Sequence, residues 1–471
     1  MAKPMTPELV RDLVSRLDPS TKVVTRDQPE YETAIARWSQ ASVKAAGAVA
    51  FPRAAEEVSK IVVFASQHQV DLAVKCGGHA TGGTNSSDGG LVIDLGGMRA
   101  VTVDARKKII TAQGGALWED VNKAAAQHGL ATVGATVDKV GIGGLTLGGG
   151  FGWLSGQYGA VIDNLVRATV VLASGQIVEA SEQDNSDLFW AIRGAGHNFG
   201  VVVEFQYAAH EQPNNVFAGT LTFAPDKLDA LINVFNQRHW SPNPRAAFHC
   251  TFVKPPETGP VVAVTLFYNG DESQARTHFA SILNLGPTTS TVSSMPYPQA
   301  NEMIKDAPGG RKSLKGATFN PPIRNEFAQW LWQEFTSKVT QDPDLGRTTI
   351  SIEFYDMTRV AGVPVKKTAF PTRGFFQTGI IKLRWTDPGK DDEVRAWGRC
   401  LQAKCREEIK ENITVQPQSG ALLEYANYSE PDDLQFTAPF GPNQKTLAQL
   451  KAKYDPSCLF NKTNPITPEP A

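Results

Sequence analysis

Two glycine-rich stretches of the sequence decide how the chain folds: Lys75-Cys-Gly-Gly-His-Ala-Thr-Gly-Gly-Thr84 and Gly141-Ile-Gly-Gly-Leu-Thr-Leu-Gly-Gly-Gly-Phe-Gly152. A backbone without side chains lets a ligand approach closely, and its bare N–H groups form a nest that binds anions such as phosphate. Two such stretches in one half of the chain predict the opposite walls of one large dinucleotide site. His79 lies inside the first stretch, where a simple spacer would need no imidazole.

The composition is that of a globular protein with balanced charge. The chain has 471 residues, of which 41% are hydrophobic and 20% charged. This length is enough for two or three domains of about 100–200 residues. The 46 Lys+Arg and 48 Asp+Glu residues give a formal net charge of -2, with no basic stripe. We therefore expect neither nucleic acid nor an anionic membrane as a partner.

The first residues and the cysteines predict a compartment. The N-terminal residues lack the apolar core and the cleavage site of a signal peptide. The sequence contains no apolar run of about 18 residues, the length that a membrane span needs. The cysteines are scattered and have no metal-site spacing, at positions 76, 250, 400, 405 and 458. We expect a cytoplasmic protein with reduced thiols, no metal site and no membrane partner.

Residues 1–206 alternate short β-branched runs with helical stretches. Thr6-Pro7-Glu8 has the capping hydroxyl, first-turn proline and early acid of a helix start. We expect strands at residues 71–75, 90–95, 101–104, 108–112, 165–172, 177–180 and 200–207, and helices at residues 61–68, 117–128 and 187–192. The pattern predicts an α+β lobe of short, mixed strands.

Residues 207–410 differ in pattern and predict a second lobe. Long alternating strands are expected at residues 261–268, 348–355 and 375–385, as in an antiparallel sheet with one solvated or cavity-lining face. Helices are expected at residues 227–237 and 392–410. The Pro-, Gly- and Lys-rich residues 295–325 predict a surface loop. Residues 411–471 then return, with a strand at 422–428 and a helix at 443–454.

Five sequence blocks resemble, in order, the vanillyl-alcohol-oxidase superfamily of FAD enzymes and its berberine-bridge-enzyme-like branch. The blocks are Gly77-Gly-His-Ala-Thr-Gly-Gly83, residues 140–152, Tyr158-Gly-Ala-Val-Ile-Asp-Asn-Leu165, Arg193-Gly-Ala-Gly-His-Asn-Phe-Gly-Val-Val202, and Tyr425-Ala-Asn-Tyr428 with Lys453-Tyr-Asp-Pro-Ser-Cys-Leu-Phe460. One glycine motif alone would be a weak signal. The resemblance implies a PCMH-type FAD-binding lobe of two subdomains (residues 1–206), a substrate lobe with an antiparallel sheet covered by helices (207–410), and a C-terminal return to the first lobe (411–471).

The same resemblance implies how FAD is held. Its pyrophosphate would lie on the first glycine stretch, and His79 matches the histidine joined to the flavin 8α-methyl carbon; the other interpretation of His79 is a polar turn residue. Val137 stands where many relatives carry a second linking cysteine, so we expect a single attachment. The expected cofactor-binding residues are His79, Lys75, Cys76, Gly77, Gly78, Ala80, Thr81, Gly82, Gly83, Val140, Gly141, Gly143, Gly144, Gly149, Gly150, Gly152, Tyr158, Asp163, Val201 and Asn427.

Catalytic candidates lie mainly in the C-terminal block. Tyr428 matches the tyrosine that takes a proton from a substrate O–H or N–H, a task that needs a phenol pKa lowered from about 10. On the expected strand, Tyr425 and Asn427 share one face and Tyr428 lies on the other. Both tyrosines could instead be ordinary strand aromatics.

Tyr355, near the end of a strand in the second lobe, is a candidate helper. Glu353 points the same way as Tyr355, but the sequence leaves open which face meets the flavin. Gln377 and Arg384 are further pocket candidates. His197 and Asn198 remain open between cofactor contact and a polar loop.

The implied activity is that of an FAD-dependent oxidase. It would take a hydride from an alcohol or amine carbon of a small metabolite and use O2 as acceptor, giving H2O2; the small side chain of Val140 resembles that of oxygen-reactive members. The alternatives are a dehydrogenase or redox-neutral cyclase of secondary metabolism, an oligosaccharide oxidase, and a non-catalytic binding protein. Aromatic residues of the second lobe favour an aromatic substrate: Trp330, Trp332, Phe354, Tyr355 and Phe376. The glycine spacing does not fit a nicotinamide-binding motif, and a Gly-Lys-Ser/Thr phosphate loop is absent.

Overall fold

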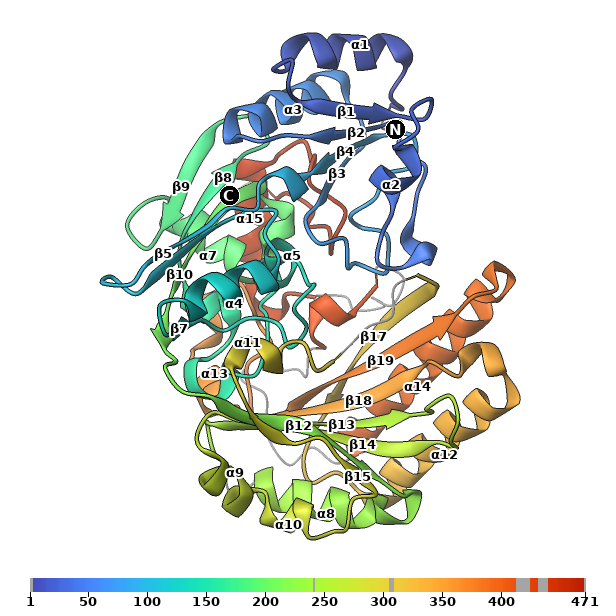
Figure 1. Ribbon diagram of the computed structural model, residues 1–471. Coiled ribbons are helices and arrows are strands. Elements are labelled where there is room, and N and C mark those ends of the chain that lie inside the picture. Colours follow the sequence, from blue (N-terminus) through green and yellow to red (C-terminus); the bar gives the residue numbers. More distant parts are fainter. Residues whose placement is uncertain (1–2, 240–241, 305–308, 412–423, 431–438, 470–471) are drawn as a thin grey trace.

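A computed structural model describes residues 3–239, 242–304, 309–411, 424–430 and 439–469. Two smaller sheets with their helices lie in the upper half of the molecule as drawn, and one large sheet lies below them (Figure 1). The helices and antiparallel sheets confirm the α+β class. In the part that the structure describes, no helix is both long and apolar enough to cross a membrane.

The first sheet has the strand order β1-β2-β4-β3, in which β1 is antiparallel to β2 and the other pairs are parallel. Its strands are β1 (Lys22–Thr25), β2 (Ala48–Phe51), β3 (Leu72–Lys75) and β4 (Leu91–Asp94), and its helices are α1 (Pro7–Arg16), α2 (Tyr31–Ile35) and α3 (Ala55–His68). Helix α1 begins as predicted, because the Thr6 side chain accepts a hydrogen bond from the Leu9 amide at 3.3 Å. Strand β3 leads directly into the first glycine stretch.

The second sheet is antiparallel throughout, with the order β5-β6-β10-β8-β9. Its strands are β5 (Val101–Asp104), β6 (Ile109–Gln113), β8 (Leu165–Val171), β9 (Ile177–Ser181) and β10 (Val201–Ala208), and a small pair is formed by β7 (Leu130–Ala131) and β11 (His210–Glu211). The helices here are α4 (Trp118–Ala126), α5 (Ile142–Leu147), α6 (Ser155–Tyr158) and α7 (Ser186–Ala195). The second glycine stretch is therefore not all loop, since it contains the short helix α5.

The large sheet runs β15-β12-β14-β13-β18-β19-β17, with β16 paired to β12, and all its pairs are antiparallel. Its strands are β12 (Val216–Phe223), β13 (Ala246–Val253), β14 (Val261–Tyr268), β15 (Thr289–Ser290), β16 (Ser293–Met295), β17 (Arg311–Phe319), β18 (Thr349–Tyr355) and β19 (Gln377–Trp385). The helices of this region are α8 (Leu228–His239), α9 (Glu272–His278), α10 (Ala280–Leu283), α11 (Tyr297–Ala300), α12 (Asn325–Gln341), α13 (Thr358–Gly362) and α14 (Asp391–Glu411).

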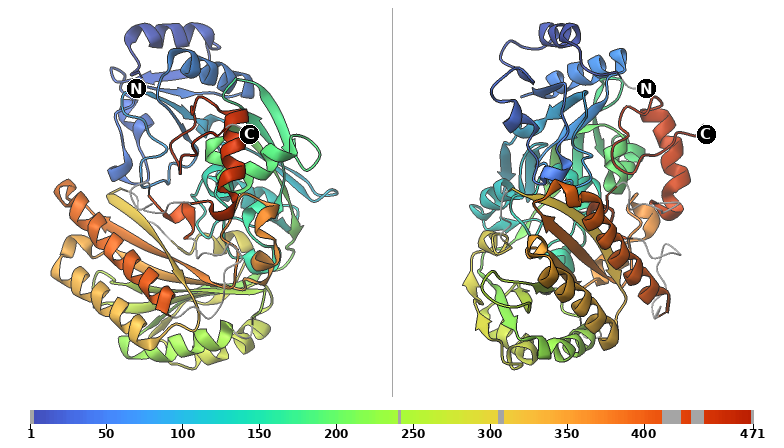
Figure 2. Two further views of the ribbon diagram at one scale, coloured as in Figure 1. Left: turned by 180° about the vertical axis from the view of Figure 1, so that it is seen from behind. Right: turned by 90° about the vertical axis from the view of Figure 1, so that its right-hand side faces the viewer.

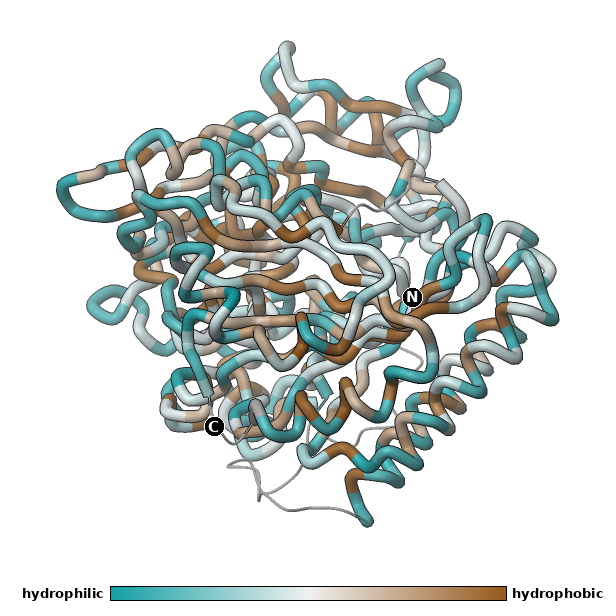
Figure 3. Tube along the Cα trace, turned by 60° about the horizontal axis from the view of Figure 1, so that its bottom comes forward, coloured by the Kyte–Doolittle hydropathy of each residue, from teal (hydrophilic) through white to brown (hydrophobic). Residues whose placement is uncertain are grey.

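Helices α8, α12 and α14 cover the face of the large sheet that lies away from the smaller sheets (Figure 2). Their apolar side chains share one buried cluster with the strands; Phe235 of α8, for example, contacts Phe354 of β18 with ring centroids 4.9 Å apart. Hydrophobic and hydrophilic residues are interleaved along the helices in Figure 3, as expected of helices that cover a sheet. The opposite face of the sheet is therefore left to line a site.

The prediction of a surface loop at residues 295–325 is wrong. Residues Arg311–Phe319 form β17, which pairs with β19 along its whole length. Its lysines misled the sequence interpretation, because Lys312 and Lys315 are buried rather than solvated. Lys315 forms an ion pair with buried Glu430 at 2.8 Å, and the Lys312 ammonium donates to the carbonyl of Trp38 at 2.7 Å.

The predicted C-terminal strand is also wrong where the structure describes it. Ala426–Tyr428 form a 3-10 turn, and residues 422 and 423 lie outside the described residues. The predicted helix at 443–454 is confirmed as α15 (Gln444–Tyr454). Tyr454 at its end donates to the Asp187 carboxylate of α7 at 2.7 Å, so the end of the chain packs against its N-terminal half (Figure 2).

Candidate active site

A cavity of about 560 Å³ lies between the glycine stretches and the large sheet. The sheet contributes alternate side chains of four neighbouring strands, as its pleat requires: His249, Thr251 and Val253 of β13, Ala263 and Thr265 of β14, Thr349, Ser351 and Glu353 of β18, and Ile380, Lys382 and Arg384 of β19. Both glycine stretches line the cavity from the other lobe, and residues 460–464 also contribute. The cavity thus has a bare backbone wall and a wall rich in polar side chains.

The two glycine stretches cross at Gly77 and Gly141. A Cβ atom at either position would overlap the backbone of the other, so only glycine allows this approach. Cys76 lies at the crossing and its thiol donates to the Ala116 carbonyl at 3.4 Å. Burial raises the pKa of this thiol, although it lines the cavity. Cys76 is therefore not activated as a nucleophile.

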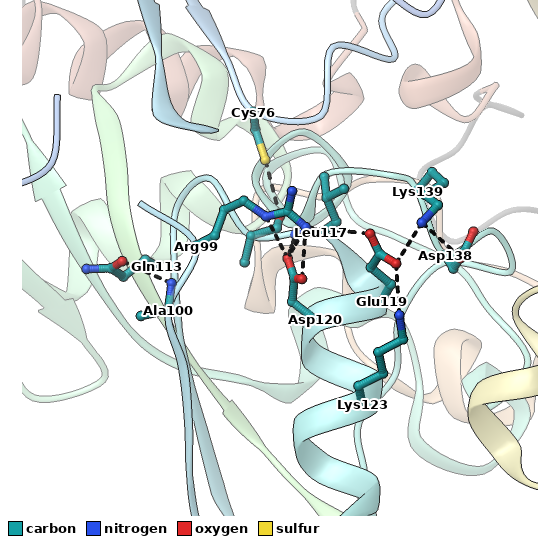
Figure 4. Close-up of polar contacts among 11 residues, drawn as sticks. Cys76, Arg99, Ala100, Gln113, Leu117, Glu119, Asp120, Lys123, Asp138 and Lys139 are labelled. Carbon is teal, nitrogen blue, oxygen red and sulfur yellow. Dashed lines mark hydrogen bonds and ion pairs between the residues drawn. The ribbon is translucent and has the colours of Figure 1, made fainter. Parts of the chain in front are cut away.

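A polar network at the start of α4 supports this crossing (Figure 4). Asp120 accepts from the Leu117 amide at 2.8 Å and forms a bidentate pair with Arg99. Glu119 forms ion pairs with Lys123 at 3.1 Å and Lys139 at 2.7 Å. Lys139 immediately precedes Val140 and Gly141, so the network fixes the segment that enters the second glycine stretch.

His79 lines the cavity and is stacked on Trp38, with ring centroids 4.7 Å apart and planes 13° apart. Burial, followed by the nearby ammonium groups of Lys312 and Lys382, lowers the pKa of His79 to about 4. The imidazole is therefore neutral at physiological pH. Neither Trp38 nor Lys312 was identified from the sequence, because Trp38 lies outside every motif and Lys312 in the supposed loop.

Tyr428 also lines the cavity, where its hydroxyl donates to the two Glu353 oxygens at 3.1 and 3.2 Å. Burial raises the pKa of Glu353 to about 7. The expected lowered phenol pKa is wrong: burial, followed by the nearby Glu353 charge, raises the pKa of Tyr428 well above its usual value. The pair therefore combines a phenol that stays protonated with a carboxylate that titrates near neutrality.

Tyr425 and Asn427 hold the second glycine stretch in place. The Tyr425 hydroxyl accepts from the Gly150 amide at 2.9 Å and from the Asn427 side chain at 2.7 Å. Asn427 also donates to the Leu145 carbonyl at 2.9 Å and lines the cavity. Tyr425 itself is buried behind the wall, where burial raises its pKa.

Tyr355 lies beneath the cavity rather than in its lining. Its hydroxyl meets His249 Nε2 at 3.0 Å, and Gln377 bonds its backbone at 2.9 and 3.0 Å. Gln377 therefore lies with Tyr355 outside the described cavity lining, whereas Arg384 lines the cavity. Lys382 is a further wall residue that alternation along β19 could have found, because it shares the face of Arg384. Burial lowers the pKa of Lys382 to about 8.

Many predicted cofactor residues meet at the cavity: Cys76, Gly77, Gly78, His79, Ala80, Thr81, Gly82, Val140, Gly141, Gly143, Gly144, Val201 and Asn427. Others are absent from its described lining: Lys75, Gly83, Gly149, Gly150, Gly152, Tyr158 and Asp163. His197 lines it as well, whereas Asn198 bonds the Asn464 carbonyl at 3.2 Å.

The predicted residues outside the lining have structural partners. Lys75 forms an ion pair with Asp94 at 2.7 Å. Tyr158 stacks on His210 with centroids 3.6 Å apart. Asp163 forms a bidentate pair with Arg373, both bonds being 2.8 Å.

The aromatic residues that favoured an aromatic substrate do not reach the described cavity lining either. Trp332 and Phe354 belong to the core between the large sheet and its helices, and Trp330 packs against that core.

The cavity fits FAD on its own features. Glycine backbone forms one wall, and a Cβ at Gly144 would meet no atom within 4 Å, so this wall is open to a flat ligand. Its volume of about 560 Å³ is within the range of cofactor sites. A neutral imidazole lies within it.

Comparisons with known proteins agree with this fit. Residues 46–181 match the FAD binding domain family. The chain is 35% identical over 454 residues to the FAD-linked oxidoreductase pgmH of Aspergillus terreus, covering 94% of this chain and 92% of the relative.

Two solved structures share the fold. The 6-hydroxy-D-nicotine oxidase of Arthrobacter nicotinovorans superposes with a TM-score of 0.82 at 24% identity, over 96% of this chain and 98% of that one. The xylooligosaccharide oxidase of Myceliophthora thermophila, in complex with xylobiose, superposes with a TM-score of 0.82 at 22% identity, over 98% and 100%. The chain belongs to the FAD-linked oxidoreductases of the vanillyl-alcohol-oxidase superfamily, with a PCMH-type FAD-binding domain.

Proposed function

We propose that this FAD-linked oxidoreductase is an oxidase of a small metabolite, with its FAD joined covalently to His79 alone. When bound, FAD supplies a hydride acceptor for an alcohol or amine carbon and passes the electrons to O2, which gives H2O2. Residues 1–206 and 411–471 would hold the cofactor, and residues 207–410 would present the substrate. The observation that carries the proposal is the Tyr428–Glu353 pair, which faces the cavity that His79 also lines.

The pair supports a two-residue base. The Tyr428 hydroxyl donates to Glu353, so its oxygen can accept the substrate proton while its own proton passes to the carboxylate. The pKa of Glu353, raised to about 7 by burial, suits a base that works near neutral pH. Tyr428 alone would be a poor base, because its pKa lies well above the usual value.

The remaining walls would bind and orient the substrate. Hydroxyl side chains line the sheet face at Thr251, Thr265 and Ser351, where they can bond to substrate hydroxyl or amine groups. Apolar side chains also line the cavity, namely Leu145, Phe151, Met303, Ile304 and Leu314. This mixture suits a compact substrate with both polar and apolar parts.

Single attachment and O2 use rest on particular residues. Val137 and Val140 both line the cavity, and Cys76 is the only cysteine in its described lining. The Cys76 thiol donates to the Ala116 carbonyl and its pKa is raised, so we expect no second link there. We assign the single link to His79 because it lies in the first glycine stretch and lines the cavity. The small side chain of Val140, which lines the cavity, would allow O2 to approach.

The relatives suggest two substrate classes. One solved neighbour is a nicotine oxidase and another an oligosaccharide oxidase. Anaerobic mixing of the purified protein with alcohols, amines and oligosaccharides tests the proposal, because a substrate bleaches the flavin absorbance. Admission of air should then restore the colour with one H2O2 per turnover. Bleaching without H2O2 release would indicate a dehydrogenase, and a protein purified without flavin would refute the proposal.

A further inference from the structure

Trp38 is the aromatic partner of His79 in the cavity. The two rings are nearly parallel, with an angle of 13° between their planes and centroids 4.7 Å apart. Both side chains are half-buried and both line the cavity. A face-to-face stack covers one face of the imidazole and leaves its edge clear. The nitrogen lone pair lies in the ring plane. By fixing that plane, the stack sets the direction of the lone pair and leaves it accessible.

Trp38 is held from two sides. Its amide donates to the Gly78 carbonyl at 3.2 Å, next to His79. On the other side the Lys312 ammonium donates to the Trp38 carbonyl at 2.7 Å and lies 4.8 Å from the centroid of its ring. The neighbouring Ser39 hydroxyl donates to the Lys312 carbonyl at 2.7 Å and accepts from its amide at 2.8 Å. The indole is thus fixed between the first glycine stretch and β17.

The same arrangement keeps His79 neutral. None of the described residues forms a hydrogen bond with its imidazole, so its position depends on the stack and on its own backbone. The charged groups that act on it are Lys312 of β17 and Lys382 of β19, and both add to burial in lowering its pKa to about 4. A neutral imidazole retains the lone pair that a nucleophile needs.

We propose that Trp38 is the positioning residue for covalent flavin attachment, acting by fixing the ring plane of His79. This inference rests on the proposed attachment through His79. In that step a bond between an imidazole nitrogen and the flavin 8α-carbon replaces one C–H bond of the methyl group. The methyl proton and the imidazole N–H proton leave with two electrons, which O2 accepts to give H2O2.

The proposal gives the large sheet a part in cofactor attachment. Lys312 belongs to β17, far along the chain from Trp38, and β17 must be docked before it can hold the indole. Attachment should therefore follow docking of the large sheet. A misplacement of about 1 Å at a reacting atom can cost roughly 100-fold in rate, so loss of the stack should slow attachment strongly.

The test compares purified holoproteins by the ratio of flavin that stays with acid-precipitated protein to flavin released. The variants are W38A, W38L and W38F, with H79A as reference. W330A is the matched control, since Trp330 is also half-buried but lies outside the described cavity lining. We expect wild type, W38F and W330A to keep the flavin in the pellet. In W38A and W38L the ratio should fall at least about 10-fold, while total bound flavin stays similar. W38L keeps apolar bulk and serves if W38A does not fold.

The outcomes separate the two proposals. Flavin that remains covalent in H79A would refute attachment through His79, and with it the role of Trp38. Loss of covalent flavin in H79A, with wild-type ratios in W38A or W38L, would refute only the role of Trp38. A fall in total flavin and thermal midpoint with an unchanged ratio would likewise show that Trp38 is merely structural.

Discussion

The Tyr428 hydroxyl donates to both carboxylate oxygens of Glu353, at 3.1 and 3.2 Å. This contact joins a turn near the end of the chain to the middle of the large sheet, 75 residues earlier. Thr378 of the neighbouring strand also donates to Glu353, at 3.0 Å. The carboxylate is thus fixed on two sides while it faces the cavity.

Substitution of either partner should remove the base. We expect Y428F and E353Q each to slow anaerobic flavin reduction by about 10²–10⁴-fold. The double variant should be no slower than the slower single variant, because the two residues act as one unit. Stopped-flow absorbance measures these rates.

Y31F is the matched control for these variants. It also removes a buried tyrosine hydroxyl. This hydroxyl donates to the Ala46 carbonyl at 2.7 Å, and Tyr31 is not part of the described cavity lining. Its reduction rate should equal that of the wild type. Additive losses in the double variant, or a wild-type rate in Y428F, would contradict a two-residue base.

The pH dependence should report the Glu353 carboxylate. Its pKa is raised to about 7, with burial as the largest cause and the Thr378 and Tyr428 hydrogen bonds opposing it. The base works only when deprotonated, so the reduction rate should fall as pH drops below about 7. E353Q should lose this limb of the profile. A wild-type rate that is flat from pH 5 to pH 8 would exclude Glu353 as the base.

Asp163 should prove structural rather than cofactor-binding. It forms a bidentate pair with Arg373, and the exposed fractions of the two side chains are 10% and 0%. Removing one partner of such a pair leaves an uncompensated buried charge, so D163A should lower the free energy of unfolding by about 3–5 kcal/mol. Urea unfolding measures the loss.

The flavin content of folded D163A should match that of the wild type. The exposed pair of Glu8 and Arg11 offers a control, since its side chains are 73% and 71% exposed. R11A should leave the unfolding midpoint almost unchanged. Loss of flavin from folded D163A would restore the cofactor role predicted from the sequence.

The crossing of the glycine stretches should not tolerate a methyl group. A Cβ at Gly141 would overlap the Gly77 backbone and the Cys76 thiol. We expect G141A to be destabilised by about 1–3 kcal/mol or more and to retain less flavin. G259A is the control, because Gly259 is exposed and its Cβ would meet no atom within 4 Å. Equal flavin content and melting temperature in the two variants would contradict the crossing.

The regular elements could be predicted where periodicity was strong. The α1 cap at Thr6, the strands before and after the glycine stretches, and the long strands β14, β18 and β19 all match their predictions. Strand β17 was missed because Lys312 and Lys315 suggest solvent, and only tertiary partners make their burial tolerable. The turn at Ala426–Tyr428 was missed because aromatic residues favour strands in isolation.

The site was predictable to the level of motifs but not of roles. His79, Tyr428 and several of the predicted glycines line one cavity, whereas Gly83, Gly149, Gly150 and Gly152 are absent from its described lining. Motif order could not show that Tyr158 and Asp163 contact structural partners instead of lining the cavity. Tyr158 stacks on His210, and Asp163 forms an ion pair with Arg373. Glu353 rather than Tyr355 is the partner of Tyr428 because its carboxylate accepts the hydrogen bond of the Tyr428 hydroxyl. That relationship is tertiary and leaves no trace in local spacing.

Peptide mapping of the purified yellow protein tests most directly whether a flavin tethered to His79 occupies this cavity. Protease digestion followed by mass spectrometry should find the flavin on one peptide only, the one that contains His79, with fragment ions that place it on the imidazole. Flavin on a different residue, or flavin that separates entirely from the peptides, would contradict the tether.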